Sequence, residues 1–500
     1  MRRIISFILP LLAVATAGAA TPPRGPLHHK STDGLMPAAY LASDSSARLS
    51  ASANSGVLEP YAVLPLEKSA AASAGRAGLA AIGADSSLLR LGWNDGLTVA
   101  QTLPALASPS ALAVGDLTGD LRPDLAALQR PANRLALATA SANGSLASPG
   151  QRALSADAEA LLADDLNADC LTDLAYTTLD GTVSVLPQLA DHALGAARAA
   201  LFPNGGATDL TTGDLNHDGQ LDLAALRGTG NPSNHVSLYT LAADTLISTG
   251  HRRAQDGDFA AHAVASGDVT GDGRADLVVG AGGNDPDAYI NIFPQQADRL
   301  LASVPVTMTA WHIPESVAVA DLTHDGRNDV VALHSGWLAL TLYRGQPDGT
   351  LAPYESYPLP YSAAYRPETL TLTDLDGDGG LDVLIADGSR GATYLRNSAG
   401  APTATIAAPG PCARMLGQTL ALSGTVSAGA AVEISLDGGA TWDAATVTGT
   451  SWTYTADLTD RAIYKRVMAR ARSGERVQAP VAEQYLTIYN YQTFLPSAQK

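Results

Sequence analysis

The sequence is poor in several residue types that mark particular classes of protein. Only two of its 500 residues are cysteine, which excludes a disulfide framework. Aromatic residues make up 5% of the sequence. Its 31 Lys and Arg residues are outnumbered by 49 Asp and Glu residues, which gives a formal net charge of -18. This balance excludes a basic nucleic-acid footprint. No apolar run approaches the roughly 20 residues that a membrane-spanning helix needs.

Common catalytic motifs are also missing. The sequence has no G-x-S-x-G, H-E-x-x-H or C-x-x-C element, and no Gly-rich phosphate loop precedes a helix pattern. We therefore expect a binding protein rather than an enzyme, with catalysis left open. The two cysteines allow one bridge, between Cys170 and Cys412, although free thiols are the expectation.

The amino terminus has the pattern of an export signal. Residues 1–20 carry Arg2 and Arg3, an apolar stretch and a small-residue end. Residues 21–55 are rich in Pro, Ser, Ala and Gly without periodicity, which predicts a flexible leader. We expect a secreted, periplasmic or cell-surface protein without a membrane span.

What the sequence does contain is an aspartate-rich nine-residue pattern, D-x-[D/N/T]-x-D-x-x-x-D, which occurs six times. We number these Asp loops 1 to 6 in chain order. Four oxygen-bearing positions, the first, third, fifth and ninth, are predicted to bind metal. In loops 1 to 3 they are Asp116, Thr118, Asp120, Asp124; Asp165, Asn167, Asp169, Asp173; and Asp214, Asn216, Asp218, Asp222. In loops 4 to 6 they are Asp268, Thr270, Asp272, Asp276; Asp321, Thr323, Asp325, Asp329; and Asp374, Asp376, Asp378, Asp382.

Alternating oxygen ligands on a tightly wound loop suit Ca²⁺, which takes six to eight oxygens, better than Mg²⁺, which keeps its waters. The sequence therefore predicts up to six calcium sites. The other interpretation is that each aspartate caps its own backbone turn. Six copies at one period favour the metal.

Glycine occupies the sixth position in loops 3 to 6, where a sharp turn needs a positive φ. These residues are Gly219, Gly273, Gly326 and Gly379. Loops 1 and 2 have Leu121 and Cys170 there, so their sites are predicted to be the weakest, or to be turns only.

Each loop lies between two apolar runs, and the loops recur every 49 to 54 residues. About four strand-like runs fit into one period, which is the content of one β-propeller blade. The segment before loop 1 adds a unit without a loop. We predict an all-β, seven-bladed propeller over residues 56–409.

These units resemble the FG-GAP and VCBS-type repeats of exported bacterial proteins and the calcium-bearing blades of the integrin alpha-chain head. The resemblance rests on elements such as GDLNHDGQLDLAAL (213–226) and GDVTGDGRADLVVG (267–280). It implies a calcium-stabilised seven-bladed propeller with its metal loops on one face. Fold does not fix the ligand.

Residues 411–490 change to alternating strand patterns and predict a small β-sandwich similar to bacterial Ig-like modules, followed by a tail at 491–500. The segment from Ser435 to Trp442 matches the S-x-D-x-G-x-T-W pattern of an Asp-box. We interpret it as a hairpin tip with a tryptophan packed behind it.

Aromatic residues gather in one region, which suits glycan or peptide contact or the filling of blade interfaces. They are Trp311, Trp337, Tyr354, Tyr357, Tyr361 and Tyr365, with His312 nearby. His217 and His324 are expected to face solvent. Our leading hypothesis is a non-catalytic calcium-binding propeller that binds a glycan or an extracellular protein. The alternative is a secreted carbohydrate-active enzyme, a lyase or glycosidase.

Overall fold

The computed structural model describes four strand segments between residues 63 and 103 and most of residues 109–489. The gaps in the second part are 130–131, 203–205, 228–234, 243–244, 255–259, 335, 337–338, 360–368, 376–379, 388–390, 396, 398–401, 411–412, 417–418, 458–463, 475 and 479–480. The predicted signal peptide, leader and tail lie outside the described residues.

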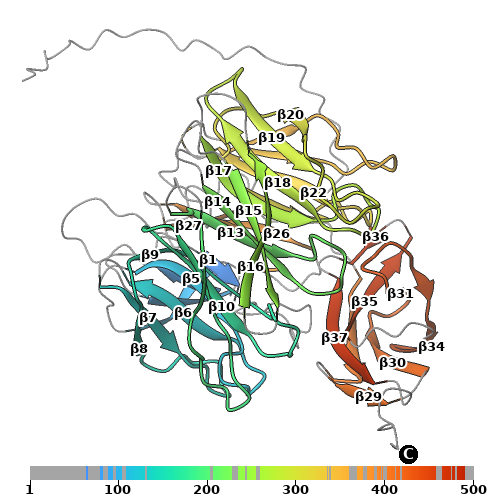
Figure 1. Cartoon of the computed structure of the whole chain (residues 1–500). Coiled ribbons are helices and arrows are strands. Elements are labelled where there is room, and N and C mark those ends of the chain that lie inside the picture. Colours follow the sequence, from blue (N-terminus) through green and yellow to red (C-terminus); the bar gives the residue numbers. More distant parts are fainter. Residues whose placement is uncertain are drawn as a thin grey trace, which may run out of the picture. The chain divides into compact units, whose positions relative to one another are not determined.

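The repeat region consists of antiparallel sheets that follow one another along the chain (Figure 1). The first four sheets are β1 (Val63–Pro65), β2 (Leu79–Ile82), β3 (Leu88–Trp93), β4 (Leu97–Thr102); β5 (Pro109–Gly115), β6 (Asp124–Gln129), β7 (Arg134–Ala138), β8 (Gly150–Ala153); β9 (Ala158–Asp164), β10 (Asp173–Thr178), β11 (Thr182–Leu186), β12 (Arg198–Leu201); and β13 (Asp209–Gly213), β14 (Asp222–Arg227), β15 (His235–Ala242), β16 (Thr245–Arg253).

Three further sheets complete this region. They are β17 (Ala261–Gly267), β18 (Asp276–Gly282), β19 (Ala288–Phe293), β20 (Val306–Thr309); β21 (Ser316–Ala320), β22 (Asp329–His334), β23 (Ala339–Tyr343), β24 (Glu355–Pro358); and β25 (Leu370–Thr373), β26 (Asp382–Asp387), β27 (Gly391–Leu395).

The first strands of successive sheets contact each other around a ring. Strand β5 contacts β9, and the series continues through β13, β17, β21 and β25. Strand β25 in turn contacts β1, and β1 contacts β5, so the series returns to its start. The predicted all-β, propeller-type fold is confirmed. The described residues contribute seven sheets to this region, while the predicted number of blades in the whole chain stays a prediction.

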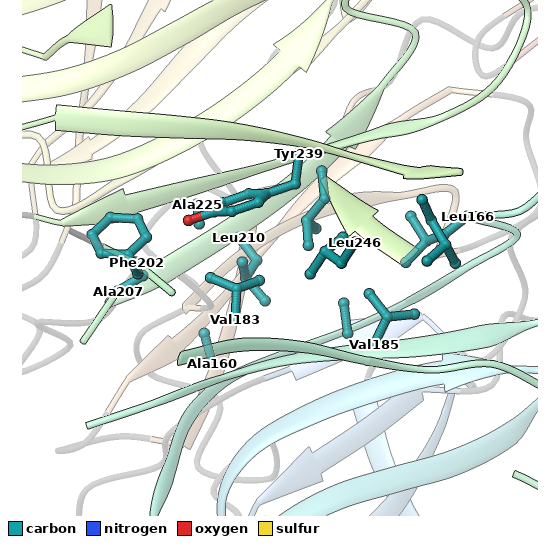
Figure 2. Packing of buried hydrophobic residues seen from close by; sticks show 13 residues of the cluster. Ala160, Leu166, Val183, Val185, Phe202, Ala207, Leu210, Ala225, Tyr239 and Leu246 are labelled. Atoms are coloured by element: carbon teal, nitrogen blue, oxygen red, sulfur yellow. The ribbon is translucent and has the colours of Figure 1, made fainter. Parts of the chain in front are cut away.

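The second strand of a sheet is buried on both faces. In β14, Leu223 and Ala225 pack toward the sheet of β9–β12, whereas Ala224 and Leu226 pack toward the sheet of β17–β20. Figure 2 shows the first of these two clusters, with Tyr239 of β15 above the side chains of the neighbouring sheet. Burial on both faces explains why such strands read as continuous apolar runs rather than alternating ones.

Two more sheets make the carboxy-terminal part. One contains β28 (Ala404–Ala408), β30 (Thr419–Val426), β34 (Ser451–Asp457) and β33 (Thr446–Thr448). The other contains β29 (Arg414–Leu416), β37 (Ala482–Tyr489), β35 (Tyr464–Ser473), β31 (Ala431–Ser435), β32 (Asp443–Ala444) and β36 (Arg476–Val477). Both sheets contribute to one apolar core around Trp452, which is 1% exposed. We call this part the sandwich; its Ig-like relationship stays a prediction.

The sandwich begins earlier than the boundary at 409–411 that the sequence suggested. Strand β28 pairs with β30, so residues 404–408 belong to the sandwich sheet. The five-residue sequence of β28, Ala-Thr-Ile-Ala-Ala, is equally typical of a blade strand. Sandwich and repeat sheets lie in the same compact unit, Gly34–Lys500. In the part of the chain that the structure describes, no helix is long and apolar enough to cross a bilayer.

Candidate metal loops and their surroundings

Each Asp loop connects the first strand of its sheet to the second. The carboxylate at the first position holds the turn together. In loop 4, Asp268 Oδ1 accepts a hydrogen bond from the Asp272 backbone N–H (3.0 Å), and Oδ2 accepts one from that of Gly273 (2.8 Å). The same two bonds recur in loops 1, 2, 3 and 5. The capping role considered for these aspartates is therefore present.

The carboxylate at the ninth position begins the second strand and joins three parts of its blade. Asp276, which is fully buried, accepts hydrogen bonds through Oδ2 from Val269 (2.9 Å) and Thr270 (2.9 Å), and through Oδ1 from Gln295 (2.9 Å). Gln295 follows the third strand. This aspartate thus fixes the loop against the strand end beside it, which its spacing in the sequence does not show.

The fifth-position aspartate is paired with an arginine two residues later in loops 1, 4 and 5. The pairs are Asp120–Arg122, Asp272–Arg274 and Asp325–Arg327. In each pair the arginine Nε also donates to a backbone oxygen next to the third strand. The sequence prediction considered only the oxygen-bearing positions and missed this arginine.

Positive φ occurs at two positions of each fully described loop. At the sixth position Leu121 (62°) and Cys170 (70°) adopt the left-handed conformation that glycine adopts in loops 3 to 5. The fourth position is left-handed as well, and its non-glycine residues are Ala168 (58°), His217 (53°) and His324 (57°). The turn geometry is thus common to all five loops, whether or not glycine is present.

The hydrogen bonding of the third-position side chain differs between the loops. In loop 1 the Thr118 hydroxyl donates to Asp124 Oδ2 (3.0 Å), and in loop 3 the Asn216 amide donates to Asp222 Oδ1 (3.3 Å). In loops 4 and 5 the hydroxyls of Thr270 and Thr323 are buried and have no hydrogen-bond partner among the described residues. A buried polar atom without a partner is unfavourable unless a ligand satisfies it.

Burial disfavours the ionised form of the ninth-position carboxyls when no cation is bound. Desolvation raises the pKa of Asp173 and Asp222 to about 7 and that of Asp276 and Asp329 to about 6, and the neighbouring loop carboxylates add to the effect. At the first position, burial and the charge of Asp329 raise the pKa of Asp321 to about 7. A divalent cation would remove this repulsion.

These properties fit calcium at loops 4 and 5. The first- and ninth-position carboxylates and the free threonine hydroxyl are oxygen ligands, which Ca²⁺ prefers. A carboxylate that accepts a backbone hydrogen bond keeps further lone pairs for a cation. Among the described residues no group of three or more His, Cys, Asp and Glu side chains forms a metal cluster, so the hydroxyl and backbone oxygens would have to complete the ligand set.

Side-chain amides of a neighbouring sheet hold the loop backbone in place. Gln188 Nε2 donates to the Asp116 carbonyl (3.2 Å), Gln295 Nε2 to that of Asp214 (3.0 Å), and Asn328 Nδ2 to that of Asp268 (3.0 Å). Each bond joins two blades next to one another in the ring. The loops are therefore also the places where blades are joined.

Two expectations about individual loop residues are wrong. His324 is not solvent-facing but buried, at 1% exposure, and lies within 3.3 Å of the Asn397 side chain. Cys170 is disulfide-bonded rather than a free thiol. Cys412, the other cysteine of the sequence, lies outside the described residues. His217 is half-buried.

Loop 6 is described only at its ends. Asp374 and Asp382 are placed, and Asp382 Oδ2 accepts the Leu375 N–H (2.9 Å), as in the other loops. Asp376, Asp378 and Gly379 lie outside the described residues.

The structure likewise describes only some residues of the aromatic group. Tyr354 and Tyr357 pack against the cores of the blades, which supports the interface-filling interpretation for these two. Trp337, Tyr361 and Tyr365 lie outside the described residues. Trp311 and His312 are half-buried, and their rings meet edge to face at 5.0 Å.

The ring of sheets, six of four strands and one of three among the described residues, and the repeated Asp loop between first and second strands define a propeller-type repeat protein. The FG-GAP-like repeat family matches residues 165–225, 268–332 and 321–385. Each matched segment starts at the first aspartate of a loop and continues past the next loop. The chain thus contains FG-GAP-like repeats, as the sequence resemblance indicated.

Solved structures with a similar arrangement are propellers of another repeat type. The WD40 β-propeller domain of Doa1 aligns at 12% identity and a TM-score of 0.44, over 70% of this chain and 96% of that chain. The WD40 domain of coronin from Toxoplasma gondii aligns at 14% and 0.45, over 68% and 84%. At TM-scores this low the likenesses carry no argument about this chain. No curated protein matches it.

Proposed function

We propose that the chain is an exported, non-catalytic propeller that binds calcium in its Asp loops and a glycan or extracellular protein on its surface. The propeller repeats support a ligand-binding or adhesion module in general. The observation that carries the calcium part is the pair of buried, unpartnered hydroxyls of Thr270 and Thr323 within the described loops, beside buried carboxylates.

In loop 4 the calcium would be held by Asp268, Thr270, Asp272 and Asp276. In loop 5 the corresponding residues are Asp321, Thr323, Asp325 and Asp329. The bound cation would supply the positive charge that these carboxylates lack. Since Asp276 and Asp329 also join strands of their blade, neutralising them would stiffen the contact between loop and sheet.

A surface for the ligand is proposed at the opposite end of the sheets. Antiparallel strands alternate in direction, so the connections β18–β19 and β20–β21 lie away from the Asp loops. There the backbone N–H of Asp285 donates to His312 Nδ1 (3.1 Å), beside Trp311. An aromatic ring beside an exposed acidic loop suits sugar hydroxyls and C–H faces.

The calcium part is tested by calorimetric titration of CaCl2 into the chelator-treated full chain. We expect binding, together with a lower melting temperature in excess chelator. An unchanged melting curve and no heat of binding would refute it.

The ligand part is tested on immobilised polysaccharides, glycans and extracellular proteins, with calcium and with chelator, while released sugar is measured. We expect retention without release, and weaker retention of Trp311→Ala than of Tyr354→Phe. Release of sugar would instead identify an enzyme. Failure to bind any of these immobilised ligands would refute the ligand-binding proposal.

A further inference from the structure

Among the described residues, segments of the sandwich contact Asp loops 4 and 5. The backbone N–H of Val477 in β36 donates to the His324 carbonyl of loop 5 (2.8 Å). A Cβ atom added to Gly273 of loop 4 would lie 2.6 Å from the backbone nitrogen of Ala440. Ala440 belongs to the segment from Ser435 to Trp442, here called the docking turn. Loops 4 and 5 are therefore contacted by the chain's own second domain.

The docking turn is a rigid element. Asp437 Oδ1 accepts hydrogen bonds from the Ser435 hydroxyl (2.7 Å) and the Thr441 N–H (2.9 Å), and Asp437 Oδ2 accepts one from the Thr441 hydroxyl (2.6 Å). Two glycines with positive φ, Gly438 and Gly439, shape its tip. The expected hairpin tip is therefore present, and it lies against loop 4.

Behind the docking turn, Arg470 of β35 is held in one position. Its Nε donates to Glu433 Oε2 (2.7 Å), and its guanidinium carbon lies 3.8 Å from the centre of the Trp442 ring. The Nε of Arg472 donates to the other oxygen of the same glutamate (3.1 Å). Two arginines thus share one carboxylate, which leaves an excess of positive charge at this place.

The excess charge lies beside loop 5. A Cβ atom added to Gly326 would lie 3.3 Å from Arg470 Nη1 and 3.7 Å from Arg472 Nη2. Burial lowers the pKa of Arg470, and the Asp321 carboxylate is one of the charges that offset this. Asp321 itself is 7% exposed. The guanidinium therefore lies beside loop 5, where it interacts favourably with the Asp321 carboxylate.

The neighbouring Arg466 is associated with another loop. It forms an ion pair with Glu483 (2.5 Å), and the Asp214 carboxylate of loop 3 is a further charge that raises its pKa. The effect on loop 5 is therefore expected from Arg470, whereas Arg466 would act on loop 3.

We propose that Arg470 and a divalent cation are competing counter-charges for loop 5, so that the docked sandwich lowers the cation affinity of this loop and cation binding there weakens the Arg470 contact. The inference rests on the calcium binding proposed above. It makes the sandwich a domain that adjusts the cation affinity of loop 5. Loop 4, which meets the uncharged backbone of the docking turn, should not respond.

The test is calorimetric titration of CaCl2 into the full chain after chelation, with tryptophan fluorescence as a second readout. Arg470→Gln should raise the affinity of one site by about three- to tenfold, because a nearby like charge is removed. Glu433→Gln should lower it, because the excess positive charge grows. Arg470→Lys, which keeps the positive charge, is the control that should leave it unchanged.

Calcium should also change the fluorescence of Trp442, identified by its loss in Trp442→Phe, and the change should disappear in Arg470→Gln. Unchanged affinity in both Arg470→Gln and Glu433→Gln, or a shift of the same sign in both, would overturn the proposal. Since the expected signs are opposite, general loosening of the fold cannot imitate them. Absence of calcium binding in every variant would refute the proposed calcium function and this inference with it.

Discussion

Loops 1 and 5 have the same pattern and the same turn geometry, but their surroundings differ. In loop 1 the Thr118 hydroxyl is satisfied by Asp124, and Leu121 is 79% exposed at the strained sixth position. In loop 5 the Thr323 hydroxyl has no partner among the described residues, Gly326 takes the sixth position, and the sandwich lies against the loop. One loop is complete as a protein turn, and the other has oxygen atoms left for a ligand.

The difference teaches that a repeated motif has two separable roles. The first and ninth aspartates build the turn in both loops through backbone hydrogen bonds. The third position decides whether the turn also presents an unused oxygen. Variants at the first, third, sixth and ninth positions can test the two roles separately.

Removing a ninth-position carboxylate should be costly in either loop, because this role is common to both. Asp276→Ala leaves the N–H groups of Val269, Thr270 and Gln295 without their acceptor. We expect a loss of about 3–5 kcal/mol in unfolding free energy. Urea unfolding in chelator measures it, with Asp276→Asn as the milder control. A similar loss in Asp124→Ala supports the shared role; a neutral Asp124→Ala would limit it to loop 4.

Acid should remove the stabilising contribution of His334 to the blade that contains loop 5. His334 is fully buried, donates from Nδ1 to backbone carbonyls and accepts from Thr341, and burial lowers its pKa to about 4. The unfolded chain has a histidine pKa of about 6.5, so between these values only the unfolded state binds the proton, and stability falls as pH falls, by up to about 1.4 kcal/mol per pH unit.

The pH effect is measured as urea midpoints between pH 7 and pH 5. His334→Gln retains a donor and an acceptor but does not titrate. The raised pKa values of Asp321 and Asp329 stabilise the fold as pH falls, so between pH 7 and pH 5 the midpoint of His334→Gln should fall less, or rise more, than that of the unchanged protein. Equal slopes for both proteins would show that His334 does not contribute.

The third position can be tested by a matched pair. Thr323→Val should lower the calcium affinity of one site about tenfold through loss of one ligand oxygen, while leaving the stability of the calcium-free protein unchanged or slightly higher. Thr118→Val should instead cost about 1 kcal/mol without calcium, because its hydrogen bond to Asp124 is lost. Calorimetry and urea unfolding measure the two effects. The same outcome in both variants would remove the distinction between the loops.

The smallest effect is expected at the sixth position. Leu121 has a φ of 62° and an exposed side chain, so Leu121→Gly should relieve strain with little loss of packing and gain about 0.5–1 kcal/mol. Gly326→Ala should lose a similar amount. Melting temperatures in chelator suffice, and a destabilised Leu121→Gly would mean that this turn is not strained.

Much of the repeat region could be predicted from the sequence because its information is local. The two apolar runs beside loop 4 are strands β17 and β18. Position nine was recognised as a ligand candidate, but its bond to the end of the third strand was not, since that partner lies 19 residues away in Gln295.

The repeat, the strand order and the turn geometry follow from the sequence alone. An apolar run, a nine-residue loop and the hydrogen bonds between neighbouring strands all lie within one period. The sequence does not show which loops the sandwich covers, that His324 is buried, or where Arg470 lies. These features depend on contacts between residues more than 100 positions apart, such as that of Val477 with His324. No periodic pattern records such contacts. They arise where the surface of the sandwich meets that of the blades.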